Sequence, residues 1–185
     1  MPTKCEGATN PICFDFPIGW EAVKYDEEGG FYRTTVTKHV NLIRGMDLVA
    51  VPPGAPRVVF IEVKDFRKAA PDDPEARNAK LIDTVLRKTL YTLAGLVAAE
   101  RVGEASLRPF AMLSRQPPVQ VVLFLVEAPL ASKLRQQNQR VGRNDLEQSL
   151  TAQLAAWGLD FALRGAPTPL VPPTLAADGW EARVA

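Results

Sequence analysis

The sequence predicts an α/β fold in which a mixed central sheet is flanked by helices. Short apolar segments separated by turn residues fill the first third of the chain, which is typical of strands. A long segment with apolar residues at three- and four-residue spacing follows, which indicates a helix. Another apolar strand and further helical segments come next, and the 185 residues suffice for one domain of this class.

Four strand-like segments precede the long helix. Residues 20–26 and 31–37 flank a turn with two glycines, so we expect them to form a hairpin. Residues 46–52 and 57–64 are joined by a proline-rich turn and form a second predicted pair. The run Val58–Ile61 is apolar at every position, which is typical of a central strand covered on both faces.

The rest of the chain is predominantly helical in pattern. Polar residues 65–79 are expected to form a surface loop, and helical character is expected from about Pro74 to Val102. The buried stripe of this helix is predicted to contain Ile82, Leu86, Leu90, Leu93 and Val97.

The segments after the long helix predict one more central strand and an edge strand. Residues 119–126 are expected to form the central strand, and 159–163 an edge strand. Two helices are expected at 130–140 and 144–157, the second capped by Asn144.

The composition excludes several classes of function. Lys plus Arg (22) nearly equals Asp plus Glu (21), so any nucleic-acid contact must come from a local basic patch. The single histidine excludes multi-histidine metalloenzymes, and no phosphate-binding glycine loop is present. No segment is long and apolar enough to span a bilayer or resembles a signal peptide. We therefore expect a cytoplasmic protein in which Cys5 and Cys13 are reduced thiols.

The strongest chemical signal lies at the end of the second strand pair. Side chains alternate along a strand, so Glu62 and Lys64 project to the same face. If the two strands pair, Asp47 comes alongside Glu62. Carboxylate oxygens are the ligands that Mg²⁺ prefers, and the carbonyl of Val63 is a further candidate ligand. Lys64 could orient an attacking water or neutralise charge that develops on a phosphate.

The arrangement of Asp47 followed by Glu62-Val63-Lys64 at the end of an apolar strand resembles the PD-(D/E)XK nuclease superfamily. The resemblance covers about residues 20–127, with Met46 where the family often has proline. It implies a restriction-endonuclease-like core, Asp47 and Glu62 as metal ligands, and Lys64 as the catalytic lysine. The expected cofactor is Mg²⁺ (or Mn²⁺), and the expected partner is nucleic acid, DNA before RNA.

The division of the chain follows from this resemblance. Residues 1–19 are an N-terminal extension, 20–165 the nuclease-like domain, and 166–185 a proline-rich tail expected to lie extended on the surface. A homodimer or a protein partner is left open.

Each core residue also has a simpler interpretation. Glu62 and Lys64 could form an ion pair that caps a strand end, and Asp47 could stabilise a turn after Gly45. On that basis the alternatives are a nuclease-fold subunit that binds or scaffolds without catalysis, and a structural protein in which the motif is coincidental.

Supporting positions are predicted on the long helix. Many superfamily members carry Gln and Tyr four residues apart there, and this chain has Arg87 and Tyr91 at that spacing. Arg87 or the neighbouring Lys88 could contact a phosphate, or all three could belong to a solvated helix face.

Other charged residues could complete the site. Glu21 and Asp26 are candidates for a further acidic ligand, although a solvated hairpin is the simpler reading. Arg67 and Lys68 follow the catalytic strand and could grip substrate. The most basic stretch, Lys133–Arg143, could track a nucleic-acid backbone or form a solvated helix.

Overall fold

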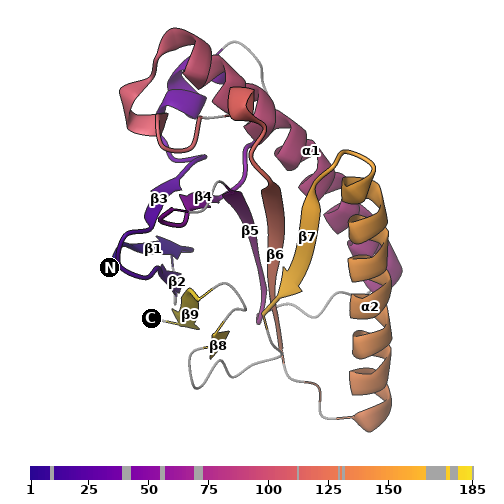
Figure 1. Cartoon of the computed structure of the whole chain (residues 1–185). Coiled ribbons are helices and arrows are strands. Elements are labelled where there is room, and N and C mark those ends of the chain that lie inside the picture. The colour runs from indigo at the N-terminus through magenta and orange to yellow at the C-terminus, as the bar shows by residue number, and fades with distance from the viewer. Residues whose placement is uncertain are drawn as a thin grey trace.

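The protein is built in three layers, with helices over one face of a five-stranded sheet and a small second sheet over the other (Figure 1). This computed structural model describes residues 1–8, 11–38, 43–54, 57–68, 73–111, 113–128, 130, 132–165, 174–175 and 179–184. The α/β class and the mixed sheet expected from the sequence are confirmed.

The central sheet has the order β3-β4-β5-β6-β7. Its strands are β3 (Glu21–Lys24), β4 (Leu48–Val51), β5 (Val58–Phe66), β6 (Val119–Glu127) and β7 (Asp160–Arg164). The first three are antiparallel neighbours, whereas β5, β6 and β7 run parallel. Parallel strands require crossover connections, and the two helices supply them.

Helix α1 (Pro74–Val102) connects β5 to β6, and α2 (Lys133–Ala155) connects β6 to β7. Asp73 caps the first turn of α1 by accepting hydrogen bonds from two backbone N–H groups. At the other end Gly103 ends the helix with a φ of 69°, a left-handed conformation that glycine adopts without strain. Both crossovers advance in the same direction across the sheet, and connections of the usual right hand then place both helices on one face, as Figure 1 shows. The expectation of helices around the sheet therefore holds for that face alone.

The second sheet joins the two ends of the chain. Its order is β1-β2-β9-β8, with β1 (Thr3–Glu6), β2 (Ile12–Asp15), β8 (Thr174–Leu175) and β9 (Glu181–Val184). Residues of the N-terminal extension thus pair directly with residues of the C-terminal tail. This sheet covers the central-sheet face that the helices leave open.

The two faces of the central sheet enclose two apolar cores. The core under the helices includes Val58, Phe60, Val85 and Leu150. In the core between the sheets, the Phe14 and Phe124 rings meet edge to face with centroids 5.1 Å apart. β5 contributes to both cores because alternate residues point to opposite faces.

The segment expected to be a strand at 31–37 is instead a π-helix, Tyr32–Val36. The buried Tyr32 ring stacks on Tyr25 with centroids 4.8 Å apart, and Gly95 of α1 leaves room for both rings. This packing outweighs the strand preference of the threonines and valine. Strand β3 pairs with β4 instead. Short 3₁₀ helices lie at Ala105–Leu107 and Leu113–Arg115.

The predicted helical details need three corrections. The most deeply buried residues of α1 are Leu81, Val85, Thr89, Thr92, Leu96 and Ala99. Of the predicted stripe, Ile82, Leu86 and Leu93 are partly buried against the same core, whereas Leu90 and Val97 are exposed. The helices expected at 130–140 and 144–157 are one continuous helix, α2, so Asn144 caps nothing. The expected loop at 65–79 is shorter, because β5 extends to Phe66 and α1 begins at Pro74.

The sequence predicted that the two cysteines are reduced thiols, and this prediction is wrong: they form a disulfide. Cys5 and Cys13 lie directly opposite each other in the antiparallel β1–β2 pair, with Cα atoms 4.0 Å apart. That pairing depends on the fold of the extension, which spacing alone did not reveal. Among the described residues, no helix is both long and apolar enough to cross a membrane.

Candidate functional site

The pairing of β4 with β5 places Asp47 beside Glu62, as the sequence predicted. The register pairs Leu48 with Ile61, and Asp47 and Glu62 are the next residues outward on the two strands. The backbone N–H of Val63 donates a 2.7 Å hydrogen bond to Asp47 Oδ2. The Asp47 carboxylate is therefore fixed by the strand that carries Glu62.

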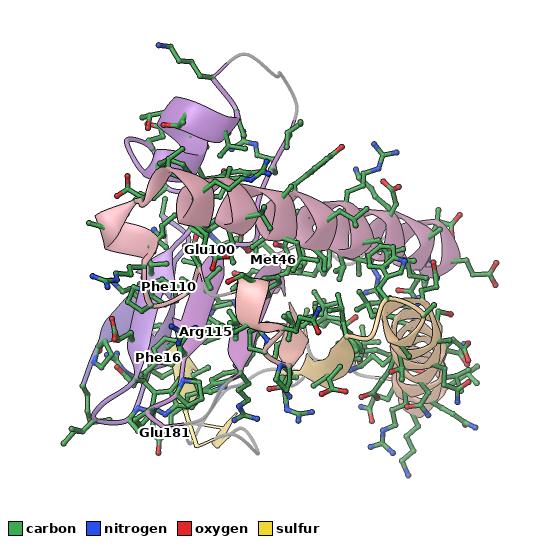
Figure 2. The ribbon with its side chains drawn as sticks, turned by 45° about the horizontal axis from the view of Figure 1, so that its top comes forward. Phe16, Met46, Glu100, Phe110, Arg115 and Glu181 are labelled. Atoms are coloured by element: carbon green, nitrogen blue, oxygen red, sulfur yellow. A yellow bond between two sulfur atoms is a disulfide. The ribbon has the colours of Figure 1, made fainter. Side chains whose placement is uncertain are left out.

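Helix α1 packs over the sheet next to the Asp47–Glu62 pair. Met46, which precedes Asp47, donates its backbone N–H to Thr92 Oγ1 at 2.8 Å and lies close to α1 in Figure 2. Phe16 and Glu181 lie farther from that helix, in the region of the second sheet. The site thus occupies the helix-covered face of the central sheet.

Lys88 of α1 joins the two carboxylates. Its Nζ lies 2.9 Å from Asp47 Oδ1 and 2.7 Å from Glu62 Oε2. Lys64 approaches the other oxygen of Glu62, with its Nζ 2.6 Å from Oε1. Two lysines and two carboxylates therefore form one compact, charge-balanced cluster.

Glu62 is the most deeply buried member of the cluster, with a side chain 0% exposed. Burial raises the pKa of Glu62 to about 7, and the charge of Asp47 adds to the rise, although both lysines oppose it. Glu62 Oε1 is held by a 2.6 Å ion pair with Lys64 whose angles are poorer than those of a standard hydrogen bond. Glu62 is thus incompletely compensated where it lies.

Lys88 responds in the opposite sense. Burial lowers the pKa of Lys88, but the charges of Glu62 and Asp47 outweigh burial and raise it overall. The ammonium is consequently held charged between the two carboxylates. One carboxylate oxygen from each strand converges on a single cation.

This donor set fits a hard divalent cation in chemistry. Asp47 Oδ1 and Glu62 Oε2 aim at one point, and the buried Glu62 Oε1 is held by the ion pair with Lys64. Among the described residues no group of three or more acidic, histidine or cysteine side chains is arranged to hold a metal. Because Lys88 Nζ already lies where the two oxygens converge, a divalent ion at this point would have to replace the Lys88 ammonium.

A cavity of about 450 Å³ opens beside Asp47. Asp26, one of the two predicted acidic candidates, lines it with a side chain only 10% exposed. Burial raises the pKa of Asp26 despite its ion pairs with Arg33 at 3.4 Å and Arg44 at 3.7 Å. Glu6 of β1 lines the same cavity, although sequence reasoning assigned it no role.

Glu21, the other acidic candidate, is exposed at the start of β3 and borders a different cavity. Arg87 is an exposed residue paired with Asp83 at 2.7 Å, one turn earlier on the outer face of α1. Neither residue joins the cluster.

Arg67 and Lys68 lie in the bend that directly follows β5. Arg67 pairs with Asp65 at 2.7 Å, and Lys68 is exposed. Tyr91 is partly buried and packs against the core under the helices. Of the predicted supporting residues on α1, only Lys88 reaches the carboxylates.

Comparison with protein-family models, with curated proteins and with solved structures finds no match to this chain. The geometry of the cluster is consequently the basis for assigning a function.

Proposed function

We propose that the protein is a Mg²⁺- or Mn²⁺-dependent nuclease with a restriction-endonuclease-like core. DNA is the proposed substrate, with RNA as the alternative. The observation that carries the proposal is the convergence of Asp47 and Glu62 on one cationic nitrogen, with Lys64 at the other oxygen of Glu62. These residues come from adjacent strands and the crossover helix, so the fold itself brings them together.

Asp47 and Glu62 would hold the metal, with the carbonyl of Val63 as a further candidate ligand. A divalent cation in this position supplies Lewis-acid polarisation of a phosphoryl oxygen. The hydrogen bond from the Val63 N–H to Asp47 keeps that carboxylate oriented without consuming its other oxygen.

The lysines supply positive charge on either side of Glu62. Lys64 is 28% exposed, so its ammonium can reach a phosphate at the surface while its stem stays on β5. There it would orient the attacking water and stabilise negative charge developing on the phosphate. Lys88 is only 12% exposed and holds the carboxylates together before substrate arrives. Released from them, it would contact the same phosphate.

A second function is favoured by the same lysine. Because Lys88 and Lys64 together balance the charges of Asp47 and Glu62, the cluster needs no metal for charge balance. A catalytically weak nucleic-acid-binding or scaffolding subunit would retain this arrangement. The near balance of 22 basic and 21 acidic residues is compatible with such a role.

A cytoplasmic location remains a prediction from the sequence. The Cys5–Cys13 disulfide is unusual for that compartment, where thiols are kept reduced. The possible homodimer or protein partner also remains a prediction.

A cleavage assay separates the two functions. The protein is incubated with single-stranded DNA, double-stranded DNA and RNA, in Mg²⁺, Mn²⁺ or EDTA. We expect cleavage that requires the metal and is lost in Glu62→Gln and in Lys64→Ala.

Arg87→Ala is the matched control, because Arg87 is a basic residue one position from Lys88 but turned away from the cluster. Metal-dependent cleavage that persists in both Glu62→Gln and Lys64→Ala would overturn the site assignment. Binding without cleavage under every condition would favour the scaffolding function.

A further inference from the structure

A second cavity, of about 460 Å³, lies where the parallel strands β5 and β6 end. Its walls include Phe66 from the end of β5, Glu127 from the end of β6 and Arg77 from the first turns of α1. Helix α2 contributes Arg135, Asn138 and Gln139. Ligands of α/β proteins commonly bind at the carboxyl ends of parallel strands, and this volume is within the range of small-molecule sites.

The cavity has an excess of positive charge. The Glu127 carboxylate is buried between Arg77 Nη1 at 2.5 Å and Arg143 Nη1 at 2.8 Å, so one acid faces two guanidinium groups. Arg143 does not itself line the cavity, but Arg135 does, and it adds a second guanidinium to the wall beside Arg77 with no ion-pair partner in the described part of the chain. Arginine is well suited to phosphate because its planar fork donates two parallel hydrogen bonds.

The same cavity offers surfaces for a planar group. Phe66 borders it, and the Arg77 guanidinium carbon lies 5.6 Å from the centroid of that ring. The amides of Asn138 and Gln139 also line the cavity, and neither has a hydrogen-bond partner among the described residues. Amide side chains pair with the edges of nucleobases, and aromatic rings or guanidinium planes stack on their faces.

The cavity is close to the cluster of Asp47, Glu62, Lys64 and Lys88 and lies on the same face of the sheet. Phe66 follows Lys64 by two residues on β5, so strand alternation directs both side chains toward the helices. Two residues of a strand span about 7 Å. Nucleotides rise by about 3.4 Å each along a stacked strand. A strand with a phosphate at Lys64 therefore brings a neighbouring nucleotide within reach of Phe66.

We propose that this cavity is a nucleotide subsite, in which the base lies against Phe66 and Arg77 and its phosphate pairs with Arg135. The inference deepens the proposed nuclease function and rests on it. It also assigns a purpose to the basic start of α2, because Arg135 is the residue of that stretch that enters the cavity with two amides beside it.

The test measures binding separately from cleavage. Fluorescence anisotropy of a labelled single-stranded oligonucleotide is recorded in EDTA across a range of salt concentrations. We expect Arg135→Ala to weaken binding about fivefold and to reduce the slope of log affinity against log salt by about 0.7, the value for one phosphate contact. We expect Phe66→Leu, which keeps apolar volume but removes the ring, to weaken binding about tenfold without changing the slope.

Arg140→Ala is the matched control, because Arg140 is an exposed arginine of α2 that does not line the cavity. Competition with free adenosine monophosphate shows which ligand the cavity prefers. If it binds free nucleotides, adenosine monophosphate displaces the labelled strand as well as an unlabelled oligonucleotide does. If it binds a nucleotide within a strand, the oligonucleotide competes better. The subsite is overturned if Arg135→Ala and Phe66→Leu both bind like wild type, or if wild type binds neither ligand. Cleavage that persists while both variants bind normally would remove the subsite and leave the nuclease. Subsite binding without metal-dependent cleavage would do the reverse.

Discussion

Two buried glutamates lie on neighbouring strands of one sheet, facing the same helices, yet their surroundings differ. Glu127 ends β6, and each of its oxygens accepts a hydrogen bond from a guanidinium, one from Arg77 and one from Arg143. Glu62 faces two ammonium groups instead, and the ion pair at one of its oxygens has poorer angles than a standard hydrogen bond.

The difference separates a carboxylate that holds the fold together from one that, under the proposed function, binds the metal. Glu127 ties β6 to α1 and α2 through always-charged, multiply bonded partners. Lys64 and Lys88 are point charges on flexible stems, and they can release Glu62 to a stronger cation. Incomplete compensation of a buried group is typical of functional sites.

The largest expected effect is on catalysis at Glu62. Glu62→Gln should reduce the rate of metal-dependent cleavage by about a hundredfold or more, because it removes the charge that faces the cation. Measured kcat on the best oligonucleotide substrate provides the test. Glu127→Gln, measured on the fraction that remains folded, should retain most of the kcat, and any effect on the proposed nucleotide subsite should appear in KM. Equal losses in both variants would remove the distinction between the two glutamates.

Stability should respond in the opposite order. Glu127→Gln should lower the free energy of unfolding by about 3 kcal/mol, because it leaves two mostly buried arginines without their carboxylate. Urea denaturation in EDTA measures this. A Glu127→Gln variant as stable as wild type would show that the arginine network contributes little.

The pH dependence of stability should reveal Glu62 in metal-free protein. Its pKa is raised from 4.5 to about 7 in the folded state, so between these values folded protein binds a proton that unfolded protein has released. Stability should therefore fall as pH rises through this window, because ionised Glu62 is desolvated and repelled by Asp47 despite Lys64 and Lys88.

Urea denaturation in EDTA across that range, on wild type and Glu62→Gln, tests this expectation. The variant should lack this part of the slope and be more stable than wild type above pH 7. A slope that Glu62→Gln leaves unchanged would mean that another group titrates in the window.

Lys88 provides a smaller effect that sharpens the same comparison. Lys88→Met removes the ammonium that a metal must replace, so affinity for Mn²⁺ should rise by about tenfold, equivalent to about 1.4 kcal/mol. Calorimetric titration measures this, and Arg77→Met at the other glutamate should leave Mn²⁺ affinity unchanged. Weaker Mn²⁺ binding in Lys88→Met would show that the ammonium supports the site and does not compete for it.

Arg87→Ala should have the smallest effect. Arg87 is exposed and pairs only with Asp83 among the described residues, away from the cluster. Cleavage rate and salt dependence of binding should match those of wild type. A reduced salt slope would place Arg87 on the path of the nucleic acid.

The sequence predicted that Asp47, Glu62 and Lys64 lie together because the cause of this proximity is local. The turn between β4 and β5 sets the register that brings Asp47 to Glu62, and strand alternation places Lys64 beside it. These inferences required only adjacent segments of chain.

The remaining features depend on distant contacts. The apolar residues of α1 occur in adjacent pairs, such as Leu81-Ile82 and Val85-Leu86, so periodicity alone could not decide which member faces the sheet. The predicted stripe is displaced by one residue from the most deeply buried one. For that reason Lys88 was not expected to lie between the two carboxylates.

Residues of the N-terminal extension were equally hard to place. Glu6 and the Cys5–Cys13 disulfide depend on the extension folding into a sheet with the C-terminal tail. Segments so far apart along the chain leave no short-range pattern that marks their pairing.

The most direct test is to measure Mn²⁺ binding by calorimetry to three proteins, namely wild type, Glu62→Gln and Glu127→Gln. The account predicts one site in wild type, retained in Glu127→Gln and lost in Glu62→Gln. Binding that survives in Glu62→Gln, or is lost only in Glu127→Gln, would contradict it.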